Sequence, residues 1–168
     1  MINWGIIGLG RIARDFALGF KDIKNAKLLG VASKTQKNLI DFREKFNIDN
    51  KYCFSNYEEL IACDKIDIIY IALPHNLHFD WIMKCLENNK KVLTEKPATS
   101  SLNDIKQINE TLNNKAIFFA EGFMYRYHPQ TAKVISLIKN NEIGDLVSME
   151  SNFGINLIEK RNIFGFKR

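Results

Sequence analysis

The chain has 168 residues, which is enough for one well-buried domain or for one domain and part of another. Hydrophobic residues make up 46% and charged residues 26%, as in ordinary soluble globular proteins, and no apolar run approaches the length that spans a membrane. The formal net charge is +5, but lysine and arginine are dispersed among acidic residues and asparagine, which favours a solvated surface and argues against nucleic-acid binding.

The three cysteines indicate the compartment. Cys53, Cys63 and Cys85 are isolated from one another, form no C-x-x-C pair and are odd in number, so three free thiols in a reducing cytoplasm are the simplest account. The N-terminus has no basic stretch before an apolar core, as a signal peptide would have. We therefore expect a cytoplasmic protein that contacts no membrane, and the sequence predicts no metal site.

An apolar strand, a glycine turn and the start of a helix are predicted at the N-terminus. The turn from Gly8 to Ala13 reads G-L-G-R-I-A and fits the dinucleotide-binding fingerprint. Gly8 suits the tight turn, and Gly10 leaves room for a pyrophosphate beside the backbone. The N–H groups at the helix start, at Arg11 and Ile12, then face the phosphates. The alternative is a glycine-rich turn that binds nothing.

Short apolar runs alternate with segments of helical periodicity along the first 120 residues. Strands are predicted at 28–32, 52–54, 67–73, 91–94 and 116–120, and helices at 12–20, 39–46, 57–61, 79–86 and 105–112. This α/β alternation predicts a Rossmann-type doubly wound parallel sheet, with helices on both faces and strand order 3-2-1-4-5-6. In that order the loops that leave strands one, four and five meet at one edge, which is the crevice where such folds bind ligands.

Three helix starts carry capping signals. Ser55 and Glu58 have the spacing of a capping box before the third helix. Ser101 precedes the fifth helix with Asp104 three residues later, and Thr35 is the candidate cap of the second helix.

Ser33, Lys34 and Thr35 follow the second predicted strand, where this fold holds the adenosine ribose. An NAD site usually places Asp or Glu there, whereas the 2′-phosphate of NADP requires cations and hydroxyl groups. The segment has no carboxylate and carries the positive charge of Lys34. The sequence therefore predicts NADP binding in preference to NAD, with a solvated loop lysine as the alternative for Lys34.

Three stretches stand out along the chain. They are the glycine turn, Glu95-Lys96-Pro97 at the end of the fifth predicted strand, and residues 123–129, which read F-M-Y-R-Y-H-P. Together they resemble the Gfo/Idh/MocA oxidoreductase family, most closely its branch of xylose dehydrogenase, dihydrodiol dehydrogenase and glucose–fructose oxidoreductase. The resemblance implies an NAD(P)-dependent dehydrogenase or reductase acting on a sugar, a sugar derivative or a cyclic diol, and a homo-oligomer in the full-length form.

The resemblance assigns catalysis to Lys96. Removing a hydride from an alcohol carbon requires the hydroxyl proton to leave as well, so a general base must stand beside the nicotinamide. By the resemblance Lys96 belongs in that role or next to it, Glu95 orients the nicotinamide end, and Pro97 fixes the backbone so that Lys96 points one way. The alternative for Lys96 is a surface lysine before a proline.

The loop from Leu73 to His78 resembles the family's Pro-Asn-x-x-His element beside the nicotinamide ribose. Pro74 and His78 match that element, and His75 replaces the usual asparagine. The resemblance implies cofactor contacts for Leu73, Pro74, His75 and His78. Alternatively, His78 caps the helix that follows.

Residues 121–168 are predicted to lie outside the dinucleotide-binding domain, which takes residues 1–120. A helix at 131–140 and an alternating strand at Leu146–Phe153 are expected there, and in the family they begin a second α+β domain with the substrate residues and usually the subunit interface. Tyr125, Arg126 and His128 either line the sugar site or pack the junction between the domains.

The resemblance covers only the N-terminal part of such an enzyme. The chain ends at Arg168, and the Asp and His partners that the lysine has in the family find no counterpart in it. A fragment of a longer enzyme and a truncated gene product are both open explanations. The alternative function is a catalytically silent nucleotide-binding fragment or a redox-sensing module.

Overall fold

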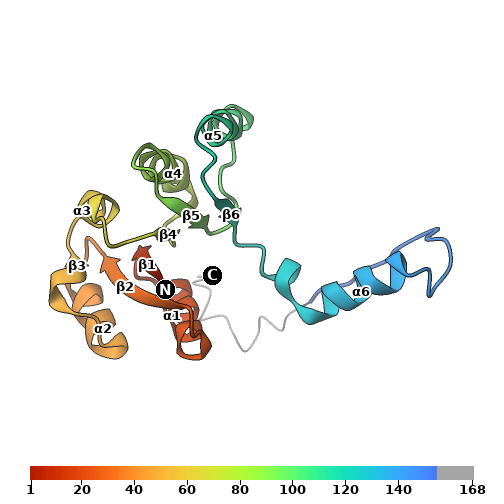
Figure 1. The fold of residues 1–168 in the computed structure, drawn as a ribbon, viewed down its shortest axis with the longest axis horizontal. Coiled ribbons are helices and arrows are strands. Elements are labelled where there is room, and N and C mark those ends of the chain that lie inside the picture. Colours follow the sequence, from red (N-terminus) through yellow and green to blue (C-terminus); the bar gives the residue numbers. More distant parts are fainter. Residues whose placement is uncertain (155–168) are drawn as a thin grey trace, which may run out of the picture. The chain divides into compact units, whose positions relative to one another are not determined.

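The structure, a computed structural model, describes residues 1–154 and divides the chain into two compact units, Met1–Phe123 and Met124–Arg168. The expectations that concern residues 155–168 lie outside the described residues. Figure 1 shows the first unit as a sheet with helices packed against it, and the described part of the second unit as a helix with flanking turns.

The first unit is built on a six-stranded parallel sheet (Figure 1). Its strands are β1 (Ile2–Ile7), β2 (Ala26–Ala32), β3 (Cys53–Phe54), β4 (Ile68–Ile71), β5 (Lys91–Thr94) and β6 (Phe119–Glu121). They lie in the order β3-β2-β1-β4-β5-β6, and each neighbouring pair is parallel. The predicted doubly wound Rossmann fold is confirmed.

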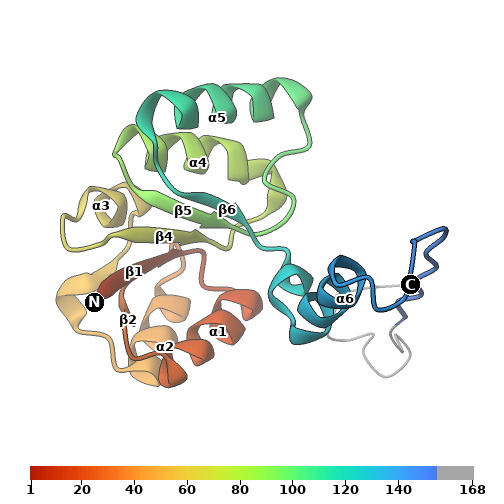
Figure 2. The same cartoon turned by 45° about the vertical axis from the view of Figure 1, so that its right-hand side comes forward.

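Helices cover both faces of this sheet (Figure 2). One face carries α1 (Arg11–Leu18) and α2 (Gln36–Phe46), and the other carries α3 (Tyr57–Ala62), α4 (His78–Glu87) and α5 (Leu102–Lys115). Three 3₁₀ turns join these elements, namely η1 (Gly19–Asp22), η2 (Asn50–Tyr52) and η3 (His75–Leu77). Successive strand residues point to opposite faces, so Tyr70 packs with the α1 and α2 layer while Ile69 and Ile71 pack with the other.

Two of the predicted capping groups can be compared directly with the structure. Ser101 caps α5 as predicted, because its Oγ accepts a hydrogen bond from the Asp104 N–H at 3.3 Å. The prediction for α3 is wrong by one residue, since Asn56 and not Ser55 accepts from the Glu58 N–H, at 2.7 Å. Asn56 is the extended residue directly before the helix, so its carboxamide reaches the first turn.

The start of α2 and the end of α5 are set by backbone conformation and not by a side-chain cap. Thr35 precedes α2 as predicted, although its side chain makes no capping hydrogen bond. Ala116 adopts a left-handed conformation, with φ 51°, that ends α5. β6 therefore begins at Phe119, later than the predicted residue 116.

The second unit contains η4 (Met124–Tyr127) and α6 (Pro129–Lys139), so its helix begins two residues before the predicted 131–140 segment. His128 caps α6, because its Nδ1 accepts a hydrogen bond from the Gln130 N–H at 3.2 Å. Proline suits the first helical position that follows, since its missing N–H would have no partner there.

The predicted strand at Leu146–Phe153 is wrong, because these residues form neither helix nor strand. Alternating apolar residues make a strand only where a neighbouring strand takes up the backbone hydrogen bonds. Within residues 1–154 the six strands of the first unit form the sheet, and this segment pairs with none of them. Its apolar side chains accordingly face solvent, with Val147 94% and Phe153 93% exposed.

The cysteines are free thiols, as predicted. Burial raises the pKa of the Cys85 thiol to about 12 and also raises the pKa of Cys53. Both thiols are therefore poor nucleophiles at neutral pH. No helix in the part of the chain that the structure describes has the length and apolarity needed to cross a membrane.

Candidate functional site

Three loops leave the carboxyl edge of the sheet side by side. β1, β4 and β5 are neighbours in the sheet, and their ends are tied by backbone hydrogen bonds. The Ala72 N–H donates to the Ile7 oxygen and the Glu95 N–H donates to the Ile71 oxygen, each at 2.9 Å. The glycine turn, the Leu73–His78 loop and the Glu95–Pro97 segment therefore start from one edge, which is the arrangement that the predicted strand order requires.

Gly8 occupies a position that other residues cannot take without strain. Its φ is +86°, which L-residues with a side chain rarely adopt. A Cβ at this position would lie 2.6 Å from the Ala72 oxygen and 2.7 Å from the Leu73 Cδ2 atom. The turn thus depends on glycine because β1 passes directly against the end of β4.

Gly10, unlike Gly8, lies in open surroundings. It precedes α1 with an ordinary φ of −80°, it is exposed, and a Cβ there would meet no atom within 4 Å. The first turn of α1 contains no acidic residue, and Arg11 and Ile12 are exposed beside it. Open space in front of a helix N-terminus suits an anionic diphosphate, so these residues fit the dinucleotide that the fingerprint predicts.

Ser33 and Thr35 shape the loop after β2. Ser33 is 5% exposed, and its Oγ accepts a hydrogen bond from the Thr35 N–H at 3.1 Å. The Ser33 N–H donates to the Phe54 oxygen, also at 3.1 Å, which joins the loop to the end of β3. Thr35 is exposed at the start of α2, whose first turn has no acidic residue.

The Lys34 side chain extends from the same loop toward the start of α3. It is exposed, and its Nζ lies 5.6 Å from the centroid of the Tyr57 ring. A hydrogen bond from Lys84, with a weaker contribution from the Lys34 charge, holds the pKa of Glu58 below its usual range. Lys34 therefore places a positive charge on the exposed surface of the loop after β2, beside the Tyr57 ring.

The loop after β4 exposes some of its predicted site residues and buries others. Pro74 and His75 are exposed, whereas Leu73 is 9% exposed and His78 is fully buried. The two ring nitrogens of His78 face backbone oxygens, with Nδ1 2.7 Å from that of Pro97 and Nε2 2.8 Å from that of Leu73.

These contacts correct both interpretations of His78. The ring has no exposed surface with which to contact a ribose, because it lies between the loops that follow β4 and β5. It does not cap α4 either: Leu77 is the N-cap residue, and no side-chain capping bond is formed. The role of the His78 side chain is therefore internal to the protein.

The Glu95–Ala98 segment is held from three sides. Tyr70 of β4 donates its hydroxyl hydrogen to Glu95 Oε1 at 2.5 Å, and Glu121 at the end of β6 accepts from the Ala98 N–H at 2.7 Å. His78 contacts the Pro97 oxygen, as described above. Lys96, in the centre of the segment, is exposed, and the Lys96–Pro97 peptide is cis. The exposed Lys96 amine is therefore attached to a backbone segment that contacts with Tyr70, Glu121 and His78 hold in place.

The sequence alone does not indicate that Tyr70 and Glu121 hold this segment. Tyr70 is 2% exposed, and its ring centroid lies 4.0 Å from that of Phe16. Burial, together with the hydrogen bond to Glu95, raises the pKa of Tyr70. One signal was available, since a tyrosine inside a fully apolar strand needs a hydrogen-bond partner for its hydroxyl group.

Replacing Tyr70 with phenylalanine is expected to lower the free energy of unfolding by about 1–3 kcal/mol, because the Glu95 carboxylate loses a donor in a part-buried position. Urea denaturation of Tyr70→Phe, Glu95→Gln and the double variant measures the coupling between the two residues. Tyr52→Phe, in a half-buried tyrosine of η2, is the control. A coupling energy near zero would show that the contact does not stabilise the segment.

The three substrate candidates lie in the second unit. Tyr125 and Arg126 belong to η4, and His128 is the residue that caps α6. All three are exposed. Their contact with a sugar remains a prediction.

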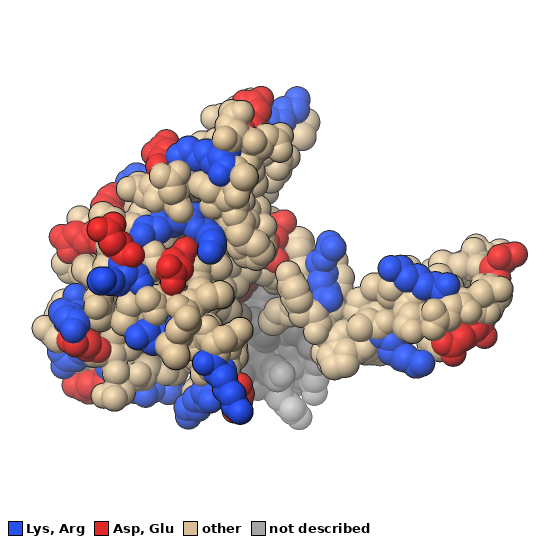
Figure 3. Space-filling view, viewed as in Figure 1, with Lys and Arg blue, Asp and Glu red and all other residues tan. Residues whose placement is uncertain are grey.

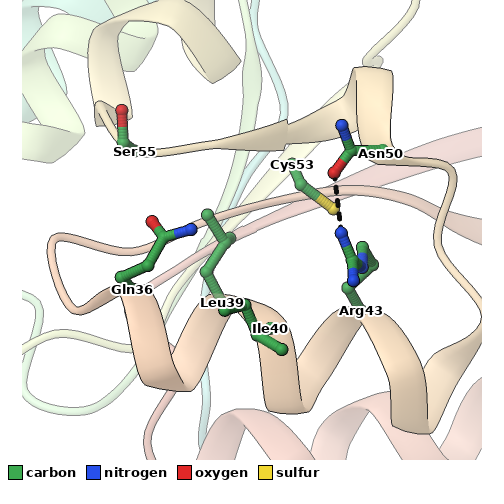
Figure 4. Close-up of a pocket in the computed structure, with 7 residues that line it drawn as sticks. All are labelled: Gln36, Leu39, Ile40, Arg43, Asn50, Cys53 and Ser55. Carbon is green, nitrogen blue, oxygen red and sulfur yellow. Dashed lines mark hydrogen bonds between the residues drawn. The ribbon is translucent and has the colours of Figure 1, made fainter.

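Figure 4 shows a pocket of about 260 Å³ between α2 and the segment of η2 and β3, lined by none of the predicted site residues. Arg43 Nη1 donates to Asn50 Oδ1 there at 2.8 Å. On the face of the first unit drawn in Figure 3, Lys and Arg side chains alternate with Asp and Glu rather than gathering in one patch.

Comparison with known proteins agrees with the fold and with the glycine turn. Residues 2–123 match the Gfo/Idh/MocA family described as "Oxidoreductase family, NAD-binding Rossmann fold". The chain is 28% identical to trans-1,2-dihydrobenzene-1,2-diol dehydrogenase of Xenopus tropicalis over 157 residues, covering 92% of this chain and 47% of that protein. It is 30% identical to D-xylose 1-dehydrogenase (NADP(+)) 2 of Haloferax volcanii over 154 residues, covering 92% and 46%.

A solved structure leads to the same assignment. The crystal structure of scyllo-inositol dehydrogenase from Lactobacillus casei, with bound NAD(H) and scyllo-inositol, matches with a TM-score of 0.80 and 26% identity, covering 86% of this chain and 43% of that one. The chain spans about half the length of the curated relatives it matches. Through its NAD-binding Rossmann domain, the chain belongs to the Gfo/Idh/MocA oxidoreductase family.

Proposed function

We propose that the chain binds a nicotinamide dinucleotide at the carboxyl edge of its sheet and supplies Lys96 as the catalytic residue of a dehydrogenase or reductase. The observation that carries the proposal is that exposed Lys96 follows β5 at the edge where the Gly8–Gly10 turn follows β1, with only β4 between these strands. The open surroundings of Gly10 support diphosphate binding next to Lys96.

The residues at this edge have different roles in the proposed reaction. A bound nicotinamide supplies the hydride chemistry. Lys96 accepts the hydroxyl proton of an alcohol substrate during oxidation and returns it during reduction. Glu95 presents a carboxylate whose position Tyr70 fixes, and Leu73, Pro74 and His75 contact the cofactor from the β4 side.

The proposed substrate is a sugar, a sugar derivative or a cyclic diol. Support comes from the relatives, whose names specify a xylose dehydrogenase, a dihydrobenzenediol dehydrogenase and a scyllo-inositol dehydrogenase. Tyr125, Arg126 and His128 are the candidates on this chain for contacts with substrate hydroxyl groups, because all three side chains carry groups that can hydrogen-bond to a hydroxyl. A homo-oligomer is proposed for the full-length form.

The proposed preference for NADP rests on Lys34. Replacing Lys34 with glutamate is expected to weaken NADPH binding by about 10- to 100-fold, because a charge-assisted contact with the 2′-phosphate is replaced by repulsion. NADH has no 2′-phosphate, so its affinity changes much less. Titrating the purified chain with each cofactor and following nicotinamide fluorescence measures both dissociation constants.

A variant with the same change in net charge serves as the control. Lys45 is exposed near the opposite end of α2, so Lys45→Glu is expected to leave the ratio of the two affinities unchanged. An unchanged ratio in Lys34→Glu would remove Lys34 from the site. A folded wild-type chain that bound neither cofactor would overturn the proposed function itself.

A catalytically silent nucleotide-binding module is the second candidate function. It is favoured by the family match, which covers residues 2–123 and is described as an NAD-binding Rossmann fold. A panel of sugars and cyclic diols, added to the chain with NADP and followed by absorbance of the reduced nicotinamide, separates the two candidates. Cofactor binding without turnover of any compound would support the module.

A further inference from the structure

His78 is a fully buried titratable side chain at the first position of α4. Its ring spans two segments that are far apart in the sequence. Nε2 lies 2.8 Å from the Leu73 oxygen, just after β4, and Nδ1 lies 2.7 Å from the Pro97 oxygen, just after β5. The ring therefore bridges two of the three loops at the carboxyl edge of the sheet.

The identity of these two partners restricts the protonation state of the ring. A backbone carbonyl oxygen only accepts hydrogen bonds, and a neutral imidazole has a single N–H group. A neutral ring would direct the lone pair of its other nitrogen at a carbonyl oxygen inside the protein, which is unfavourable. A ring that is protonated on both nitrogens donates to both oxygens, and distances of 2.7 and 2.8 Å are typical of charge-assisted bonds.

Other groups around the ring have opposing effects on its protonation. The positive end of the α4 dipole disfavours a charged ring, whereas Asp80 in the first turn of the same helix favours it. The ring of His75 in η3 lies 5.5 Å away between centroids. Lys96 adjoins Pro97 in the sequence, and the Glu121 carboxylate is bound to the next residue of that segment. Burial of the ring also disfavours a charge on it. The inference rests on the geometry of the two carbonyl oxygens, which are in direct contact with the ring and can only accept hydrogen bonds.

We propose that His78, protonated on both ring nitrogens, is a positioning residue that ties the backbone after Lys96 to the end of β4 and thereby fixes where the Lys96 side chain stands. The inference rests on the proposed catalytic role of Lys96. It assigns to His78 neither a cofactor contact nor a proton transfer. Proline at position 97 cannot donate through its nitrogen, so the carbonyl group of this residue is the only backbone atom that it offers to such a bridge.

The protonation state can be read directly from the wild-type chain. Nitrogen NMR of the chain labelled with ¹⁵N-histidine distinguishes protonated from unprotonated ring nitrogens, and the exposed residues His75 and His128 are assigned with His75→Gln and His128→Gln. At neutral pH we expect both nitrogens of His78 to be protonated and to carry slowly exchanging hydrogens. An unprotonated nitrogen in the His78 ring would overturn the inference, even if every His78 variant failed to fold.

The positioning role is tested with His78→Phe, which keeps a ring but has no donors. Cys85→Ala is the matched control, because Cys85 is also fully buried on α4 but packs in the apolar cluster. Both variants are expected to lose stability. Only His78→Phe should shift or broaden the backbone amide signals of Lys96 and Ala98, and unchanged signals in a folded His78→Phe would contradict the proposed role.

These measurements need no cofactor, so they are separate from the test of the proposed function. If the wild-type chain binds no NADPH, the proposed function falls, whereas the histidine spectrum still reports on the bridge. In a form that turns over, His78→Phe should lower kcat by about tenfold or more while the KM for the cofactor changes little. An equal loss in Cys85→Ala would mean that general destabilisation, and not the position of Lys96, limits the reaction.

Discussion

Lys96→Met should lower kcat by about 10²- to 10⁴-fold, because the substrate hydroxyl group loses its general base. The affinity for NADPH should change little, since methionine keeps most of the length of the side chain and the N-terminus of α1 is untouched. Stability should also be preserved, because the Lys96 side chain is exposed. Turnover is measured with sugars and cyclic diols, on the chain itself and on a chimera completed with the remaining part of the Haloferax volcanii relative.

Lys91→Met controls for the loss of a positive charge on the same strand. Lys91 is exposed at the beginning of β5, at the opposite edge of the sheet from Lys96. Its replacement should therefore leave kcat unchanged. Full activity in Lys96→Met would remove Lys96 from catalysis, whereas equal losses in both variants would point to a general effect of charge.

Gly8→Ala should destabilise the first unit by about 2–6 kcal/mol, which combines the strain of a positive φ with overpacking. The added Cβ would lie 2.6 Å from the Ala72 oxygen, and a backbone atom cannot move aside as a flexible side chain can. Urea denaturation followed by circular dichroism measures the loss. A loss of this size is comparable with the whole stability of many domains, so a fraction of the variant should be unfolded without denaturant.

Gly10→Ala is the matched control for this prediction. Gly10 has an ordinary φ and no neighbouring atom within 4 Å of an added Cβ, so its replacement should change stability by less than about 1 kcal/mol. It should nevertheless weaken NADPH binding, because the added methyl group occupies the space in front of α1. Equal destabilisation by both substitutions would contradict the distinction between the two glycines.

The sequence predicted the parts of the site that depend on local pattern. The glycine turn follows an apolar strand and precedes a helix, and Lys96 is the second residue after β5, so strand order alone placed both at one edge. Periodicity also distinguished helices from strands throughout the first unit. The incorrect or missing predictions concern features that depend on contacts between segments far apart in the sequence.

The side-chain bridges depend on distant contacts that no local pattern contains. Tyr70 and Glu95 are separated by 25 positions, and His78 and Pro97 by 19, so their hydrogen bonds exist only once β4 and β5 pair. For His78, family resemblance suggested a cofactor contact, because a histidine in a loop beside a crevice is easily read as a ligand. Its complete burial could be known only from the packing of α4.

The predicted strand at Leu146–Phe153 failed for a related reason. Alternation of apolar and polar residues shows that a segment can form one face of a sheet, but pairing requires a second strand. Within residues 1–154 the segment has no such partner.

The Tyr70 side chain joins two regions of the site that are otherwise far apart in the sequence. Its ring lies against Phe16 of α1, and its hydroxyl group holds Glu95. Helix α1 begins at the proposed diphosphate site, whereas Glu95 belongs to the proposed nicotinamide end. Among relatives, positions 16, 70 and 95 should therefore be substituted in a correlated manner, because a smaller ring at position 16 would let Tyr70 move and release the carboxylate at position 95.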